Sequence, residues 1–246
     1  QMCIRDRSIT DRQHRILDLL TERGYITVNE LSAILFTSPS SIRRDLTALQ
    51  NSGQVRRLHG GGELAERLCG VPSLTDRMKK NVLQKRQIAK EASAYIHDGQ
   101  RILLDGSSTA GFLLPYIAKH QGVSLFTNNI SVAVHAIELN IYTTLLGGHS
   151  VNGSMALAGP FTYKALGDIQ PDILFFSSQS IDENGVITDS TEEENYLRTL
   201  MLEASDRRIF LCDSSKFYTR SGYVLTTLDK VECMISDKPF AVKERK

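Results

Sequence analysis

Short apolar segments alternate with helical segments over most of the chain beyond residue 80. We expect strands over Arg101–Asp105, Val123–Thr127, Thr143–Leu146, Ile173–Ser177, Ile209–Cys212 and Val231–Ile235. A helical pattern over Asn81–His97 precedes the first of these strands, and another lies around Val132–Glu138. Strands that are apolar throughout are buried on both faces, and strands connected through helices run parallel. This order predicts an α/β domain whose parallel sheet is covered by helices on both faces.

The first 65 residues follow a different order, with three helices before a hairpin. Asn29 is predicted to cap the short second helix. Ser38 as N-cap and Pro39 at the first helical position begin the third helix. Val55–Leu58 is predicted to be a strand that leads into three glycines at positions 60–62. Helices joined by a tight turn and followed by a hairpin predict a winged helix-turn-helix.

The third helix presents two different faces. Ile42, Leu46 and Leu49 recur at i, i+4 and i+7 and form its buried stripe. The outward side presents Ser40, Ser41, Arg43, Arg44 and Thr47. Asp45 points close to the buried stripe, so we expect it to form a structural ion pair rather than to contact a base.

Hydroxyls and arginines on the first turns of such a helix suit a DNA major groove, since arginine pairs with guanine edges or phosphates. Residues 1–67 hold ten basic against eight acidic residues, and Asp45 is the only acidic residue expected to oppose the arginine cluster. A small helical bundle with a solvated charged face is the alternative, but the turn, the Ser-Pro start and the basic hairpin together favour DNA. We expect DNA contacts from Ser38, Ser40, Ser41, Arg43, Arg44, Thr47, Arg56, Arg57 and His59.

These residues resemble the DeoR family of bacterial sugar-metabolism regulators. The resemblance rests on Ser41-Ile42-Arg43-Arg44-Asp45-Leu46, then Gly53, Arg57 and His59-Gly60-Gly61. The family commonly has threonine where Ser41 stands, which keeps the hydroxyl. The resemblance continues to about residue 237 and implies a regulator of a sugar operon, with repression as the expected sign of control.

Polar loops follow several of the predicted strands in the second domain. Asp105 ends one strand and precedes Gly106-Ser107-Ser108-Thr109, an order typical of an anion site at a helix start but also of a plain helix cap. Thr127-Asn128-Asn129 and Gly147-Gly148 follow two further strands. We expect all of these loops at the carboxyl edge of the sheet, where open α/β domains bind ligands. Lys216 follows another strand and is either an anion ligand or a loop lysine in solvent.

The DeoR resemblance implies that this domain is similar in fold to ribose-5-phosphate isomerase and responds to a phosphorylated sugar. Gly106 and Ser107 are exchanged relative to the usual family loop, Ala110 replaces a threonine, and the segment 176–182 departs from the usual glycine-containing form. We expect effector contacts from Asp105, Gly106, Ser107, Ser108, Thr109, Thr127, Asn128, Asn129, Gly147, Gly148 and Lys216.

The fold class expected is therefore α/β, with a winged helix-turn-helix over residues 9–64, a linker over 65–80 and a Rossmann-like sensor domain over 81–240. Two rival functions stay open. One is a sugar-phosphate isomerase with an appended DNA module, using Asp182, Glu183 or Asp105 as the base. The other is an architectural DNA-binding protein whose second domain only oligomerises.

Other features narrow the class of protein. The chain has no apolar run of membrane-spanning length, and Gln1–Ser8 lacks the apolar stretch of a signal peptide. The four cysteines show no metal-site spacing, which favours incidental thiols in a reducing cytoplasm. We expect no cofactor and no metal. Double-stranded DNA, a phosphorylated sugar and further copies of the chain, as a dimer or tetramer, are the expected partners.

Overall fold

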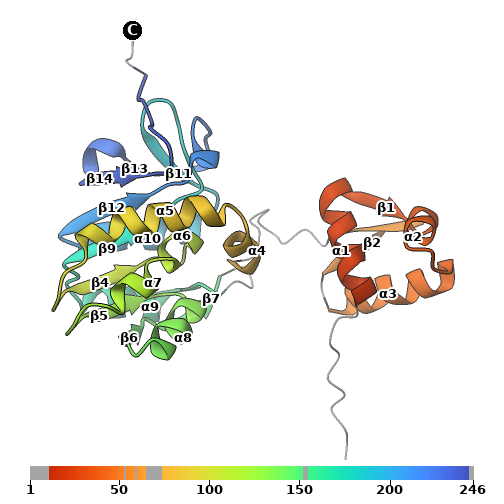
Figure 1. Cartoon of the computed structure of the whole chain (residues 1–246), viewed down its shortest axis with the longest axis horizontal. Helices are drawn as coiled ribbons and strands as arrows, with labels where there is room; N and C mark the ends of the chain where they lie inside the picture. Colours follow the sequence, from red (N-terminus) through yellow and green to blue (C-terminus); the bar gives the residue numbers. More distant parts are fainter. Residues whose placement is uncertain (1–10, 53, 59, 65–73, 152–154, 244–246) are drawn as a thin grey trace, which may run out of the picture. The chain divides into compact units, whose positions relative to one another are not determined.

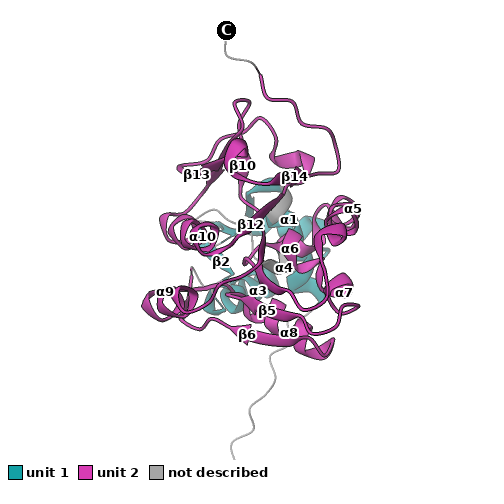
Figure 2. Ribbon diagram, turned by 90° about the vertical axis from the view of Figure 1, so that its left-hand side faces the viewer, with its two compact units in different colours: residues 1–70 teal, residues 71–246 magenta. Residues whose placement is uncertain are grey.

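A computed structural model describes residues 11–52, 54–58, 60–64, 74–151 and 155–243. The chain divides into two compact units, residues 1–70 and 71–246, which we describe separately (Figure 2). No helix in the described ranges is long and apolar enough to cross a membrane.

Unit 1 contains three helices and a small antiparallel sheet (Figure 1). The helices are α1 (Asp11–Arg23), α2 (Val28–Ile34) and α3 (Pro39–Asn51). The strands are β1 (Tyr25–Thr27), β2 (Val55–Leu58) and β3 (Gly61–Leu64), in the order β1-β3-β2. A Cβ atom at Gly61 would lie 2.4 Å from the Ile26 carbonyl oxygen, so glycine is required where β3 approaches β1. These elements form the predicted winged helix-turn-helix.

The starts of α2 and α3 are fixed by different side chains. Thr27, not Asn29, caps α2, because the Thr27 hydroxyl accepts from the Glu30 amide while the Glu30 carboxylate accepts from the Thr27 amide. The prediction for Asn29 was wrong because this reciprocal pair moves the cap two residues earlier. Ser38 caps α3 and Pro39 occupies its first turn, as predicted.

The core of unit 1 lies between its helices and its sheet. It includes Ile16, Leu20, Leu31, Ile42, Leu46, Leu49 and Val55, all buried. Asp45 is buried beside this core, and its carboxylate accepts from Arg12 Nε at 2.5 Å and Nη2 at 3.2 Å. The predicted structural ion pair is therefore present, and it joins α1 to α3.

Unit 2 is built on a six-stranded parallel sheet in the order β14-β12-β9-β4-β5-β6. Its strands are β4 (Arg101–Leu104), β5 (Ser124–Thr127), β6 (Tyr142–Leu145), β9 (Ile173–Phe176), β12 (Arg207–Leu211) and β14 (Cys233–Ile235). Each coincides with a predicted strand to within two residues at either end. All six carboxyl ends therefore meet at one edge of the sheet.

Helices cover both faces of this sheet (Figures 1 and 2). One face is covered by α5 (Val82–Ala92), α6 (Ser108–Gly111), α7 (Leu114–Ile117) and α8 (Ile130–Glu138). The other is covered by α9 (Pro160–Gly167) and α10 (Glu192–Ala204). Strand residues alternate between the two cores, so that Ile102 and Leu104 face the first and Leu103 faces the second.

Several elements of unit 2 were not predicted. A second sheet pairs β10 (Ser180–Ile181), β11 (Val186–Asp189) and β13 (Tyr223–Thr227) in antiparallel order, and β7 (His149–Ser150) pairs with β8 (Leu157–Ala158). Short 3-10 turns cover Ser93–Tyr95, Ser214–Lys216 and Leu228–Lys230. Part of the segment interpreted as linker, Leu74–Lys79, is helix α4, which packs against α6. Residues 65–73 of that segment lie outside the described residues.

The Asp45 ion pair gives a stability prediction. Asp45→Asn removes the charge but keeps the side-chain volume, so the free energy of unfolding of unit 1 should fall by about 1–2 kcal/mol. Asp18, an exposed carboxylate on α1, provides the matched control, and Asp18→Asn should change stability by less than about 0.5 kcal/mol. Hydrogen exchange of the α1 and α3 amides measures both values, and equal losses in the two variants would contradict the structural role of the pair.

Candidate functional site

The outward face of α3 combines arginines with small hydroxyls. Arg43, Arg44 and Thr47 are exposed on it. The Thr47 hydroxyl donates to the Arg43 carbonyl oxygen at 2.8 Å, which holds the threonine side chain along the helix. Since Asp45 faces the core, α3 presents no acidic side chain on this face. The face can therefore accept the negative charge of DNA.

The first turn of α3 is ordered by its own serines. Ser38 Oγ accepts from the Ser41 amide at 3.3 Å and donates to Ser41 Oγ at 3.0 Å. It also lies 3.0 Å from Ser40 Oγ. Ser38 and Ser41 therefore fix the start of the helix. On its first turn, Ser40 is exposed and Ser41 is half-buried.

The two hairpin arginines differ in their surroundings. Arg56 stands opposite Glu63 in the β2–β3 register and pairs with it at 2.5 Å. Arg57 Nη1 instead donates to Thr47 Oγ1 at 3.2 Å, so Arg57 extends the basic face of α3. The expectation that only Asp45 opposes these arginines was wrong, because strand pairing brings Glu63 to Arg56. His59 lies outside the described residues.

A polar cavity of about 370 Å³ lies in unit 2, where the loops after β4, β9 and β12 meet. Its hydroxyl lining consists of Ser107, Ser108, Ser177, Ser178, Ser180, Ser190, Ser215, Thr219 and Ser221. Its charged lining consists of Arg77, Lys80, Lys85, Arg198 and Lys216 with Asp189, Glu194 and Asp213. A space of this size lined by hydroxyls and cations suits a small, hydroxylated anion.

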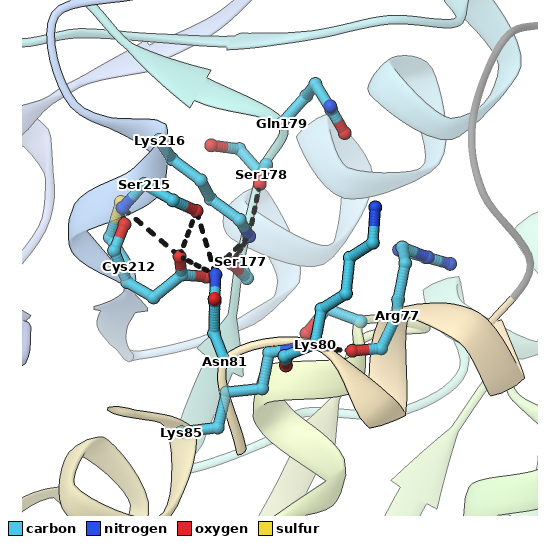
Figure 3. A network of polar contacts seen from close by, with 12 residues as sticks. Arg77, Lys80, Asn81, Lys85, Ser177, Ser178, Gln179, Cys212, Ser215 and Lys216 are labelled. Carbon is cyan, nitrogen blue, oxygen red and sulfur yellow. Dashed lines mark hydrogen bonds and ion pairs between the residues drawn. The ribbon is translucent and has the colours of Figure 1, made fainter. Parts of the chain in front are cut away.

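Lys216 is held at the cavity by the loop after β9 and by its own loop (Figure 3). Its ammonium donates to Ser177 Oγ and to the Ser178 carbonyl oxygen, both at 2.8 Å, and lies 3.9 Å from Asp213 Oδ2. Asp213 is buried, which opposes its ionisation, but the Lys216 charge and then the hydrogen bond from Ser215 hold the pKa of its carboxyl below the ordinary value. Lys216 is therefore a positioned cation rather than a loop lysine in solvent.

Arg198 is a buried cation between two buried carboxylates. Its Nε donates to Asp105 Oδ2 at 2.9 Å and its Nη1 to Asp189 Oδ2 at 2.7 Å. Burial opposes the charge of this guanidinium, but Asp189 and Asp105 outweigh it and raise the pKa of Arg198. The bridge connects α10 to the ends of β4 and β11 at the cavity.

The corner between α4 and α5 approaches the cavity from another side (Figure 3). Asn81 Nδ2 donates to Asp213 Oδ1 at 2.9 Å and to Ser215 Oγ at 3.0 Å. The buried Lys85 ammonium donates to the carbonyl oxygens of Arg77 and Lys80, so its partners are neutral. Burial, more than the nearby cations, lowers the pKa of Lys85 to about 8.

The structure brings three of the expected effector residues to the cavity: Ser107, Ser108 and Lys216. Ser107 caps α6 by accepting from the Ala110 amide at 3.2 Å. Asp105 lies beneath the cavity, where its carboxylate accepts from the amides of Ser107 and Ser177 as well as from Arg198. Its position is thus structural support for the loops that line the cavity.

The remaining expected effector residues, Gly106, Thr109, Thr127, Asn128, Asn129, Gly147 and Gly148, lie outside the lining of this cavity. Asn129 caps α8 through the Val132 amide, and Asn128 borders a void of about 10 Å³ that would hold one water. Gly148 has φ +113°, and a Cβ there would lie 2.2 Å from Thr162 Oγ1. Asn129 and Gly148 thus have local structural roles, whereas Thr109 Oγ1 and Asn128 Oδ1 are buried without a hydrogen-bond partner among the described residues. Contact of any of the seven residues with an effector stays a prediction.

The sequence reasoning missed Arg77, Lys80 and Arg198. Arg198 sits among the buried residues Leu197, Met201 and Leu202 of α10, and a charge on an apolar helix stripe was the available signal. Arg77 and Lys80 belong to a basic stretch in the segment taken as linker. No apolar periodicity indicated that this stretch would fold against the domain.

Of the three carboxylates named for the isomerase alternative, Asp105 supports the loops beneath the cavity, and the other two are engaged elsewhere. Asp182 accepts from the amides of Asn184 and Val186 in the β10–β11 turn, and Glu183 pairs with Lys243 at 2.8 Å. Neither lines the cavity. Within the described ranges no group of histidine, cysteine and acidic residues is arranged to hold a metal; Cys212 and Cys233 are free thiols, and Cys3 and Cys69 lie outside those ranges.

Comparison with known proteins agrees with this two-part organisation. Residues 12–67 match the model of the DeoR-like helix-turn-helix domain, and residues 80–238 match that of the DeoR C terminal sensor domain. Relatives include the HTH-type transcriptional regulator GolR of Listeria innocua, 32% identical over 92% of this chain and 90% of that protein. The L-fucose operon activator of Escherichia coli K12 is 33% identical over 92% and 94%. The putative aga operon transcriptional repressor of Escherichia coli O157:H7 is 31% identical over 93% and 86%.

Among solved structures, ribose 5-phosphate isomerase A from Methanocaldococcus jannaschii is similar to part of the chain. It covers 56% of this chain and 55% of its own, at a TM-score of 0.43 and 17% identity.

The buried Lys85 ammonium gives a pH prediction. Lys85 is 3% exposed and has a folded-state pKa of about 8 against an ordinary value of 10.5. Between these pH values the unfolded chain holds a proton that the folded chain has released, so the free energy of unfolding should rise with pH, by at most about 3 kcal/mol from this group. Lys85→Met should lack that rise. Urea unfolding from pH 7 to pH 11 tests it, and identical pH profiles for both proteins would show that folding does not lower the pKa of Lys85.

Proposed function

Since this chain belongs to the DeoR family and is a DNA-binding transcriptional regulator, we propose that it represses a sugar-metabolism operon under the control of a phosphorylated sugar bound in the unit 2 cavity. The observation that supports this most directly is the cavity itself. It combines hydroxyl groups for a sugar with several cations for a phosphate, in a chain whose other unit is a winged helix-turn-helix.

Operator recognition is assigned to α3. Its exposed arginines and hydroxyls would lie in the major groove, with Arg44 reading a base edge and Arg57 contacting the phosphate backbone. Arg56, already paired with Glu63, would contribute less. Ser38 and Ser41 would act mainly by fixing the start of the helix.

The effector is assigned to the loops after β4, β9 and β12. Lys216 and Arg77 would hold the phosphate, because charge-assisted hydrogen bonds are stronger than neutral ones. The serines that line the cavity would donate hydrogen bonds to the sugar hydroxyls and accept hydrogen bonds from them. The unphosphorylated sugar would leave the cations without a partner and would bind weakly.

The finer features of the regulator are also proposals. A dimer or a tetramer would place paired α3 helices on repeated half-sites. Bacterial operators are cytoplasmic, and so would be this protein. Repression is proposed as the sign of control, with an activator and a repressor both present among the relatives.

Arg44→Ala tests operator recognition. The variant should lose about 1–3 kcal/mol of operator affinity and relax the preference at one base position, because a bidentate contact to a base edge is removed. Gel-shift titration against a set of single-base operator variants measures both effects. Arg56→Ala is the comparison, and its loss should stay below about 1 kcal/mol. A larger loss for Arg56→Ala than for Arg44→Ala would reverse the assignment.

Lys216→Ala tests the effector site. A panel of sugar phosphates should raise the melting temperature of the wild type through mass action, and the parent sugars should not. The variant should lose this response, since about 1.5–3 kcal/mol of charge-assisted contact is removed. Its operator affinity without ligand should stay unchanged because unit 1 is intact. Lys230→Ala, which removes an exposed lysine outside the cavity, is the control. If a sugar phosphate still raises the melting temperature of Lys216→Ala, the phosphate binds elsewhere.

A further inference from the structure

Helix α4 occupies a distinctive place in the chain. It is the first described element of unit 2, and only residues 65–73 separate it from the last strand of unit 1. It packs against α6, where the Met78 sulfur lies 4.0 Å from the position of a Cβ on Gly111. The same α6 begins with the cavity residue Ser108. A change in the position of α4 would therefore act on the chain segment that leads to the DNA-binding unit.

The carboxyl end of α4 is tied to the cavity through polar contacts. Lys85 donates to the carbonyl oxygens of Arg77 and Lys80, the latter at 2.8 Å. Asn81, in the left-handed conformation with φ +52°, reaches Asp213 and Ser215 in the loop that also positions Lys216. The docked position of α4 and the position of the Lys216 loop thus depend on one hydrogen-bond network (Figure 3).

Arg77 brings an unsatisfied cation into this network. It lines the cavity, and its Nε is buried without a hydrogen-bond partner among the described residues. The carboxylates that line the cavity have other partners, since Asp189 accepts from Arg198, Asp213 accepts from Asn81 and Ser215, and Glu194 lies 3.9 Å from Arg198. Burying a guanidinium nitrogen without a partner costs free energy. A phosphate oxygen would supply the missing acceptor, and the planar guanidinium suits two parallel bonds to it.

Burial of the Arg77 guanidinium opposes docking of α4 when no anion is present, because desolvation outweighs the attraction of nearby carboxylates, Glu194 first among them, and lowers the pKa of Arg77. Arg77 and Lys80 add two positive charges to a cavity whose other charged lining consists of three cations, Lys85, Arg198 and Lys216, and three carboxylates, Asp189, Glu194 and Asp213. Neither of the two added cations forms an ion pair with a described carboxylate. The lining thus holds five cations against three carboxylates, and an anion that accepts from Arg77 would offset the cost of burying it, so α4 should be docked more firmly when the cavity is filled.

We infer that Arg77 is a phosphate-binding residue of the cavity and that the docking of α4 transmits the effect of ligand binding to the DNA-binding unit. The inference rests on the proposed function, because it takes the cavity as the sugar-phosphate site. Ligand would then change operator affinity through its different affinities for docked and undocked α4. No contact between the two units is required, since the chain itself connects α4 to unit 1.

Hydrogen exchange of the full-length protein with inorganic phosphate tests this inference, with chloride at equal ionic strength as the reference. In the wild type, phosphate should slow exchange of the amides at 75–81 by about tenfold, as expected if a contact of about 1.4 kcal/mol stabilises the docked helix. Arg77→Gln should lose this protection and bind phosphate at least about tenfold more weakly. Lys79→Gln, which removes a neighbouring exposed charge outside the cavity, should behave as the wild type.

Two readouts separate the failure of this inference from the failure of the proposed function. If phosphate and the sugar phosphates protect the 213–217 loop but leave the α4 amides unchanged, the cavity binds anions and the role of α4 is wrong. If they protect neither segment, the cavity is not the anion site and both proposals fail. Arg77→Lys keeps the charge without the planar donor pair and should recover part of the α4 protection, which excludes misfolding as the cause of the Arg77→Gln result.

Discussion

The Arg198 bridge is the interaction on which the geometry of unit 2 depends most. Two buried carboxylates, Asp105 and Asp189, lie close together beneath the cavity, and they would repel each other if no cation lay between them. Arg198 joins Asp105 after β4 to Asp189 at the end of β11. The same two carboxylates also accept from the amides of Ser107, Ser177 and Gln179, and so they fix the loops that line the cavity. Arg198 thus orders the residues that lie beneath the cavity.

This arrangement also explains why the remaining charge in the cavity favours an anion. Asp105 and Asp189 are buried and share the single charge of Arg198, so this cluster contributes at most one net negative charge beneath the cations of the cavity. Lys216 is directed by neutral serine groups and lies 3.9 Å from Asp213, while Lys85 donates only to carbonyl oxygens. The hydrogen bonds that hold Lys216 and Lys85 in place thus go to neutral partners. A bound phosphate would give the Lys216 ammonium a closer charged partner than Asp213, which lies 3.9 Å away.

The parallel sheet and the winged helix-turn-helix could be predicted because apolar periodicity and local caps determine them. Ser38, Pro39 and the Ile42-Leu46-Leu49 stripe fix α3 without reference to the rest of the chain. The second, antiparallel sheet could not be predicted, since strands such as Ser180–Ile181 are too short to show a pattern. The Arg56–Glu63 pair depends on hairpin register, which the sequence does not reveal.

The candidate site was predicted only in part for a related reason. Sequence order places Asn128 and Gly148 at the correct edge of the sheet, but the cavity opens above β4, β9 and β12 and not above β5 and β6. Arg198 and Arg77 reach the cavity from helices, and these two residues lie 93 and 28 positions from Asp105 in the sequence. Loops after strands can be inferred from local sequence, whereas helices that close a site are brought there by tertiary packing.

The order of elements along the chain limits how ligand binding can reach DNA. Unit 1 connects to unit 2 through the segment before α4, so a signal within one chain must change either α4 or the surface that unit 2 offers to another copy. A charge-assisted contact of about 1.5–3 kcal/mol corresponds to a change of roughly 10- to 150-fold in an equilibrium constant. One arginine contact that forms in one arrangement of α4 and not in the other is therefore sufficient for a regulatory response. A rearrangement of the parallel sheet is not needed, and its two close-packed cores would resist one.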